Sequence, residues 1–395
     1  MLAALLLAAV TAGPSGDAFY TPPSPLPPAA HGDPIWARPW TSGVAPKDAA
    51  SNTLVLYHTT SVTGADVAVS GTVSIPKGTP PKGGWPVISW THGTTGNGPQ
   101  CAPSRFDKEN TEQQSLDVWI SKGYAVVQTD YEGNGTPGIH PYFVGEAAAR
   151  DAADMVRAAR RLDSAIGTRW VVLGHSEGGA SALATASFAQ AWTPELRLLG
   201  SVAYAPASHM VGYLDDMQAA RQPVKYVGFF FLMVQGAAAA DPAIDLDKIF
   251  YPALTGRLPE LQKRCIWELD KDFAWNTVVP AELFRRDPDP AQLDELTRRI
   301  AADEPGALPM TVPVYIMQGV DDQLVAVKAT TQLVAALCTR GANVSYATFA
   351  GTDHFAVMAK SQTRAGAWIA ALRRQTGALA LRGSAVDVLV GRLLR

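Results

Sequence analysis

Alternating and continuous runs of apolar residues predict most of the secondary structure of this chain. Residues 52–62 and 67–76 are rich in β-branched side chains and alternate between apolar and polar positions, which is typical of strands. From residue 86 the pattern changes to apolar strands separated by helical segments. We expect strands at residues 86–90, 124–130, 169–174 and 199–206, and helices at residues 115–123, 144–162 and 178–192.

Strands that alternate with helices predict a mostly parallel sheet with helices on both faces. The alternation stops near Pro206 and resumes with segments at 313–319, 325–341 and 344–351. The block between them does not fit this spacing, and it contains an apolar run at 226–240 and a helical pattern at 289–304. We therefore expect an α/β core, made of residues 19–206 and 311–395, with a helical cap or lid inserted at residues 207–310.

The N-terminus has the pattern of a secretory leader. Residues 2–10 form a short apolar run followed by small residues, although no Lys or Arg precedes Arg38 as a signal peptide normally requires. The run is far shorter than the ~20 residues of a membrane span. We expect residues 1–18 to be a signal peptide, with cleavage after Ala12 or Ala18, and the mature protein to be extracellular. The proline-rich residues 19–50 predict an extended lead-in without regular structure.

Composition and charge narrow the classes of function. Apolar residues make up 47% of the 395 positions, which is enough for a large core. The formal net charge is −3 and no basic patch occurs, which argues against nucleic-acid binding. The three cysteines form no CxxC motif or cluster with histidine, so we expect no metal site.

The motif Gly-x-Ser-x-Gly at residues 174–178 is the strongest candidate for chemistry. A predicted strand runs directly into it and a helix of small residues follows, as in a nucleophile elbow. Such a turn holds the serine in a strained backbone conformation and directs a helix N-terminus at a developing oxyanion. The alternative is a glycine-rich turn with a solvated hydroxyl. We expect Ser176 to be a nucleophile.

A serine nucleophile needs a base, and the base needs an orienting carboxylate. In this type of fold the carboxylate and then the histidine follow the serine. His354 is the one histidine beyond His209, and it follows a predicted strand. The preceding strand ends in Gly-x-x-Asp, which favours Asp322, with Asp321 as the close alternative. Asp353 is interpreted as an Asx-turn residue.

An oxyanion hole needs two backbone N–H groups. The residue after the nucleophile, Glu177, supplies one. The loop after strand 86–90 supplies the other, which we assign to Thr94, with Gly93 as the alternative. His92 is interpreted as a support of this loop.

Two other glycine-rich segments have rival interpretations. The literal GxGxxG at 133–138 is interpreted as a loop near the site, because Pro137 lies within it and no helix opens on the glycines. The sequence GTTGNG lacks the lysine that a Walker A phosphate site requires. The apolar run 226–240 predicts either a buried helix or a wall of an acyl-chain pocket.

Several ordered segments carry a family resemblance. SWTHGTTGNGPQCAPS, TDYEGNGTPGIHPY, GHSEGGASALATA, GVDDQLV and GTDHF together resemble the secretory lipase family, the Candida antarctica lipase A-like enzymes of the α/β-hydrolase superfamily. The resemblance implies an α/β-hydrolase fold with a helical cap after the sixth core strand. It also implies a triad at Ser176, Asp322 and His354, hydrolysis of acyl esters, and no cofactor. Glu177 departs from the small residue that some relatives carry after the serine.

The same resemblance implies a disulfide between Cys101, in the segment QCAPS, and Cys265 in the cap. Cys338 would then be a free, buried thiol. The tail at residues 381–395 has no clear kinship with the family and is expected either to pack on the core or to lie near the site.

These observations predict a secreted serine ester hydrolase, a lipase or carboxylesterase, that works through an acyl-enzyme intermediate. An acyltransferase or amidase on the same triad, and a hydrolase of aromatic polyesters, are the alternatives. A non-catalytic binding module is disfavoured, because no triad member is missing. We expect a monomer that takes a small-molecule or lipid ester as substrate, with transient contact to a lipid interface.

Overall fold

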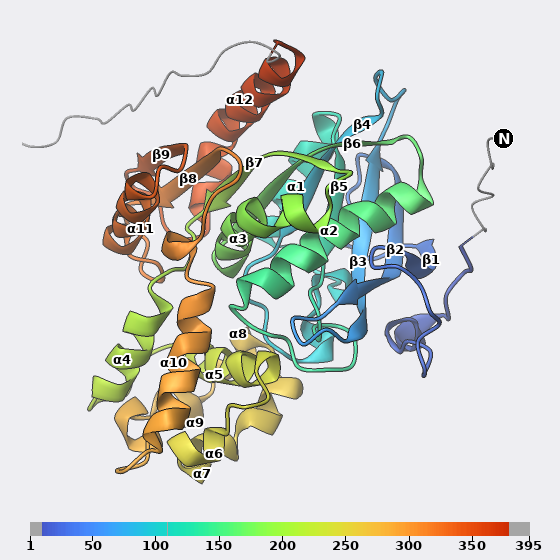
Figure 1. Cartoon of the computed structure of the whole chain (residues 1–395). Helices are drawn as coiled ribbons and strands as arrows, with labels where there is room; N and C mark the ends of the chain where they lie inside the picture. Colours follow the sequence, from blue (N-terminus) through green and yellow to red (C-terminus); the bar gives the residue numbers. More distant parts are fainter. Residues whose placement is uncertain (1–9, 109, 379–395) are drawn as a thin grey trace, which may run out of the picture.

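The computed structural model describes residues 10–108 and 110–378, which form one nine-stranded sheet with helices around it (Figure 1). The spatial order of the strands is β1-β2-β3-β5-β4-β6-β7-β8-β9. The strands are β1 (Pro34–Pro39), β2 (Ala49–Thr60), β3 (Asp66–Pro76), β4 (Trp85–Thr91), β5 (Ala125–Thr129), β6 (Ile166–His175), β7 (Arg197–Tyr204), β8 (Val314–Gly319) and β9 (Val344–Phe349).

Six neighbouring strands, from β5 to β9 in the spatial order, run parallel to one another. The first three strands of the chain pair in antiparallel fashion, and β3 joins them to β5. The prediction of a mostly parallel sheet flanked by helices is confirmed.

Helices cover both faces of the parallel strands. Figure 1 shows α2 (Gly145–Leu162) and α3 (Glu177–Trp192) on one face, and α11 (Val327–Thr339) packs beside α3 through Leu183 and Leu333. Residues of α1 (Thr111–Ser121) and α12 (Ala356–Ala378) form the core of the opposite face. Val171 and Val172 of β6 point to these opposite cores and are both almost fully buried. Burial on both faces explains why the strands are continuously apolar.

Between β7 and β8 lies a helical segment, residues 205–313, called here the insertion (Figure 1). Its α-helices are α4 (Met210–Ala219), α5 (Gly228–Ala240), α6 (Leu246–Ile249), α7 (Pro252–Thr255), α8 (Ile266–Leu269), α9 (Phe273–Asn276) and α10 (Pro290–Ala302). The insertion has its own hydrophobic core, in which Phe230 and Phe231 of α5 are fully buried. The apolar run at 226–240 therefore forms mainly a buried helix. Among the described residues, no helix has both the length and the apolar character needed to cross a membrane.

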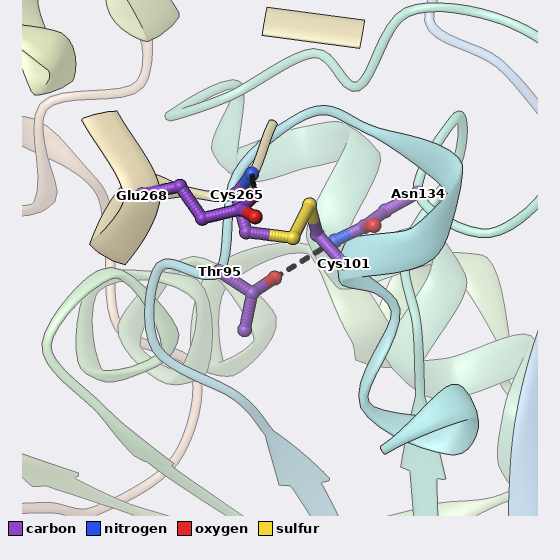
Figure 2. Close-up of a disulfide and its surroundings, with 5 residues drawn as sticks. All are labelled: Thr95, Cys101, Asn134, Cys265 and Glu268. Atoms are coloured by element: carbon purple, nitrogen blue, oxygen red, sulfur yellow. Dashed lines mark hydrogen bonds between the residues drawn. A yellow bond between two sulfur atoms is a disulfide. The ribbon is translucent and has the colours of Figure 1, made fainter. Parts of the chain in front are cut away.

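A disulfide between Cys101 and Cys265 joins the insertion to the loop that follows β4 (Figure 2). The two Cα atoms lie 5.5 Å apart, although 164 positions separate the residues in sequence. Next to the disulfide, the Ile266 N–H donates a 3.0 Å hydrogen bond to the carbonyl oxygen of Thr95. The insertion is thus fixed, covalently and by its backbone, to the loop that contains Thr94.

The expectation for residues 19–50 was wrong in part, because Pro34–Pro39 form strand β1. Among the named strands of the described residues it lies at the edge of the sheet and pairs with β2, and an isolated bridge joins Ala12 to Ala37 on its other side. A proline is tolerated on an edge strand because its missing N–H costs no ladder hydrogen bond. Since β1 adds a strand, the insertion follows the seventh strand of the chain rather than the sixth.

The expectation of a buried Cys338 was also wrong, because this free thiol is exposed. In α11 the buried positions are Thr330, Leu333 and Leu337. Cys338 follows Leu337 by one residue, and a step of one residue turns a side chain about 100° around the helix axis. This rotation places it on the solvent side.

Residues 10–18, the second half of the expected signal peptide, lie against β1. The carbonyl oxygen of Thr11 accepts a hydrogen bond from the Ala37 N–H. The Arg38 guanidinium donates to the carbonyl oxygens of Pro14 and Gly16. Residues 1–9 and the tail at 381–395 lie outside the described residues.

We expect replacement of Cys101 and Cys265 by serine to destabilise the protein by about 2–5 kcal/mol, because the disulfide closes a long loop in the unfolded chain. Thermal unfolding followed by circular dichroism would show a lower Tm for the double variant. The matched control is Cys338→Ser, which removes an exposed, unpaired thiol and should leave the Tm unchanged. An unchanged Tm in the double variant would contradict the stabilising role.

Candidate active site

Ser176 is the single residue between β6 and α3, and its backbone conformation is unusual. Its φ is 58° and its ψ is −118°, in a region that residues with a side chain rarely adopt. The Ser176 N–H donates to the carbonyl oxygen of Tyr204, and its own carbonyl accepts from Ala180 in the first turn of α3. Hydrogen bonds from the neighbouring strand and helix therefore hold the strained turn in place.

The two glycines of the Gly-x-Ser-x-Gly motif make room for this turn. A Cβ atom on Gly174 would collide with the Gly178 carbonyl and the Thr91 hydroxyl, and one on Gly178 would collide with the Thr91 carbonyl. Strand β4 therefore approaches the elbow so closely that neither position accepts a side chain. This is the arrangement of a nucleophile elbow.

His354 and Asp322 form a buried pair. The Nδ1 atom of His354 donates to Asp322 Oδ2 over 2.7 Å, and both residues are 4% exposed. Asp322 also accepts hydrogen bonds from the N–H groups of Leu324 and Val325. Because Nδ1 carries the proton, the free acceptor of the neutral imidazole is Nε2.

The surroundings of this pair shift both pKa values. Burial is the largest single influence and raises the pKa of Asp322, but the hydrogen bond and charge of His354 and two backbone hydrogen bonds together outweigh it, so the net shift is downward. Burial lowers the pKa of His354, against the opposing effect of Asp322. The aspartate is therefore ionised, and the histidine is a neutral base at neutral pH.

The other two aspartates of this region lie elsewhere. Asp321 is exposed. Asp353 accepts hydrogen bonds from the N–H groups of Phe355 and Ala356, and so caps the beginning of α12. Of the three, it is Asp322 whose carboxylate contacts His354.

The loop of His354 meets the elbow through His175, the residue before Ser176. His175 Nε2 donates to the carbonyl oxygen of His354 over 2.8 Å, and the two rings lie 4.5 Å apart. Ser176 Oγ and His354 are not hydrogen-bonded to each other within the described part of the chain. Catalytic hydrogen bonds are often long before a substrate binds.

The candidate oxyanion donors differ in availability. The N–H of Gly93 already donates to both carboxylate oxygens of Glu112, each over 3.1 Å, which favours Thr94 over Gly93 as the donor. Thr94 lines the same pocket as Ser176. Glu177 is the first residue of α3, where a helix leaves its N–H groups without intrahelical partners.

Both remaining donor residues are fixed by one segment, Tyr131–Tyr142, which contains the literal GxGxxG. The Tyr142 hydroxyl and the Thr94 hydroxyl form a 2.7 Å hydrogen bond. His140 Nε2 donates to the buried carboxylate of Glu177 over 2.9 Å. The GxGxxG itself is a loop, since the next helix begins only at Gly145. Sequence patterns gave no signal for the roles of His140 and Tyr142.

An open pocket of about 480 Å³ lies at Ser176 and Thr94. Its wall is mixed in character. Aromatic and aliphatic side chains come from Phe143, Met210, Tyr213, Phe229, Leu324 and Val325, and polar ones include Ser208, Asp216 and Lys225. Only the first part of the apolar run at 226–240 reaches this pocket, through Tyr226 and Phe229. Among residues 10–108 and 110–378, no group of three His, Cys, Asp or Glu side chains could hold a metal ion.

Comparison with known proteins identifies relatives over most of the chain. The profile of the secretory lipase family matches residues 108–381. Lipase A of Moesziomyces aphidis is 25% identical over 366 residues, which are 86% of this chain and 76% of that protein. A protein of Mycobacterium tuberculosis described as a probable inactive lipase is 24% identical over 362 residues, 84% of this chain and 76% of its own.

The fold also matches a solved structure. The crystal structure of Candida antarctica lipase A superimposes with a TM-score of 0.69 and 18% identity, over 85% of this chain and 80% of that one. At this identity the likeness shows the fold alone, a mostly parallel sheet flanked by helices of the α/β-hydrolase type.

We expect Gly178→Ala to disrupt the elbow, because the added Cβ would collide with the Thr91 carbonyl. Soluble yield and Tm should both fall. Gly212→Ala in α4 is a suitable control, since its Cβ would meet no atom within 4 Å and alanine favours a helix. A Gly178→Ala protein as stable as the control would contradict the close approach of β4.

Proposed function

Because this chain belongs to the secretory lipase family, it is a carboxylic ester hydrolase, and we propose that Ser176, His354 and Asp322 are its catalytic triad. The observation that carries the proposal is the strained Ser176 turn, with the buried His354–Asp322 pair held next to it by His175. The geometry of a triad, rather than sequence position, is what identifies it.

In the proposed mechanism, Ser176 Oγ attacks the ester carbonyl while His354 Nε2 takes its proton. Asp322 fixes the imidazole tautomer and stabilises the imidazolium that forms. The tetrahedral intermediate collapses to an acyl-enzyme, and the proton on His354 passes to the leaving alcohol. His354 then takes a proton from water, which attacks the acyl-enzyme. The proton passes to Ser176 Oγ as the carboxylic acid leaves.

The N–H groups of Glu177 and Thr94 are the proposed oxyanion donors. The Glu177 N–H lies at the N-terminus of α3, where the helix dipole favours negative charge. The contacts of Tyr142 with Thr94 and of His140 with Glu177 hold both donor residues from one segment of the chain. Preorganised donors of this kind stabilise the charge that develops in the transition state.

The proposed substrate is an acyl ester whose acyl part enters the pocket beside Ser176. The insertion supplies Met210, Tyr213 and Phe229 to the wall of this pocket, which supports a role of the insertion as a cap over the substrate. The pocket is open and partly polar, which fits a small-molecule ester as well as a lipid ester.

Secretion is part of the proposal. The name of the family and the disulfide both fit an oxidising, extracellular environment. Cleavage of the leader after Ala12 would preserve the contacts of Arg38 with Pro14 and Gly16, whereas cleavage after Ala18 would remove them. Both positions would remove the hydrogen bond between Thr11 and Ala37, so the contacts of Arg38 are what supports the earlier position.

We expect wild-type protein to hydrolyse p-nitrophenyl esters in a series from C2 to C16, and Ser176→Ala to lose activity by a factor on the order of 10⁴ or more. The preferred chain length separates a carboxylesterase from a lipase. One relative is described as a probable inactive lipase, so a complete lack of ester hydrolysis by the wild-type protein would also be informative. If wild type and Ser176→Ala release equal amounts of p-nitrophenol, the proposed triad is wrong.

A second prediction separates the two neighbouring aspartates. Asp322→Asn should reduce kcat about 10⁴-fold, because an amide at this position favours the wrong imidazole tautomer. Asp321→Asn is the matched control, since Asp321 is exposed and should be close to wild type in kcat. Steady-state kinetics on one ester decides the assignment, and a larger loss in Asp321→Asn would reverse it.

A further inference from the structure

We propose that Glu112 and His175 form a buried ion pair that positions the nucleophile and the base relative to each other. The inference rests on the proposed function, because it assigns a role to residues that contact the triad rather than the substrate. In this role Glu112 and His175 are positioning residues, and neither was singled out for it by the sequence.

Glu112 is the point at which three segments of the site meet. Its carboxylate accepts hydrogen bonds from the Trp90 indole N–H over 3.1 Å, from the Gly93 N–H over 3.1 Å, and from His175 Nδ1 over 3.0 Å. Trp90 belongs to β4, Gly93 precedes the oxyanion residue Thr94, and His175 precedes the nucleophile. One side chain therefore ties the oxyanion loop to the elbow.

The carboxylate of Glu112 is ionised. Burial is the largest single influence and raises its pKa, but the hydrogen bond and charge of His175, together with the charge of His92 and the hydrogen bond from Trp90, outweigh burial, so the net shift is downward. Glu112 is also the second residue of α1, where the helix dipole favours an anion.

His175 continues the connection from the elbow to the base. Its ring is 1% exposed, and both ring nitrogens face oxygen acceptors: Nδ1 the Glu112 carboxylate, and Nε2 the His354 carbonyl 2.8 Å away. A carbonyl and a carboxylate can only accept. Both nitrogens of His175 therefore carry a proton, and the ring is a cation that the Glu112 carboxylate neutralises.

This cation acts on His354 in two ways. It holds the backbone of His354 by a charge-assisted hydrogen bond, which fixes the loop next to Ser176. Its ring also lies 4.5 Å from the imidazole of His354. Burial is the strongest influence that lowers the pKa of His354, and the charge of His175 is the second. The opposing charges are the carboxylates of Asp322 and Glu112, which raise that pKa.

The sign of the pH effect follows from these charges. His354 must be neutral to accept the proton of Ser176, so kcat/KM rises with pH through the pKa of His354 in the free enzyme. His175→Asn removes the cation and leaves both carboxylates, so the pKa of His354 rises. The acidic limb of the plot of kcat/KM against pH should then move to higher pH.

The test compares the pH dependence of kcat/KM for wild type, His175→Asn and Glu112→Gln on one p-nitrophenyl ester. We expect His175→Asn to move the acidic limb to higher pH, and both variants to lose kcat roughly 10–100-fold with a much smaller change in KM, because misplacement of reacting groups slows chemistry more than binding. Rates are compared at a temperature where circular dichroism shows every variant folded.

The matched control is His58→Asn in β2. His58 is also 1% exposed and pairs with a carboxylate, that of Asp66, at 3.0 Å. Strands β3 and β5 separate β2 from β4 in the sheet, so this pair is remote from the elbow. The control should lose stability and keep the wild-type kcat and acidic limb. The proposal would be overturned if the acidic limb of kcat/KM lies at the same pH in His175→Asn and wild type. It would also be overturned if His175→Asn and His58→Asn shift that limb equally.

Two further results keep this inference separate from the proposed function. If Ser176→Ala is inactive while His175→Asn behaves as wild type, only the positioning role fails. If His175→Asn does not fold, neutron diffraction on wild-type crystals decides the protonation state. Deuterium on both ring nitrogens of His175 is expected, and a singly protonated ring would overturn the inference.

Discussion

The whole site depends on the close approach of β4 to the turn between β6 and α3. The backbone of Thr91 lies so near Gly174 and Gly178 that the chain can turn there only without side chains at those positions. Between these two glycines Ser176 has a positive φ. The same turn brings the N-terminus of α3 and the loop after β4 to one place, so a single packing constraint positions both the serine and the donors proposed around it.

Three buried imidazole–carboxylate pairs surround Ser176, and each fixes a different segment. Their members are His354 with Asp322, His175 with Glu112, and His140 with Glu177. Buried charges are costly unless they are paired and hydrogen-bonded. Pairing satisfies these buried groups and holds in place the segments that carry them.

Local patterns were sufficient for the parallel strands and for α1, α2, α3 and α11, because burial on both faces makes most of those strands continuously apolar. No pattern was assigned to α12, although its residues cover part of one face. Local patterns were not sufficient for β1, whose two prolines are typical of a loop and whose pairing with β2 is non-local. Chain order and strand ends indicated Ser176, Asp322 and His354 in sequence, and the structure brings the latter two into contact. The roles of Glu112 and His140 depend on contacts across 63 and 37 positions, which no local pattern reports.

The exposed thiol of Cys338 has a consequence for how the chain acquires its native covalent structure. Three thiols can form three different pairs, and only the pair of Cys101 with Cys265 is native. These partners lie 164 positions apart, whereas Cys265 and Cys338 are closer in sequence, so chain statistics favour the wrong pair in the unfolded state. In the oxidising compartment proposed for this chain, a wrong pair would be corrected by thiol–disulfide exchange, and an accessible Cys338 can also link two molecules.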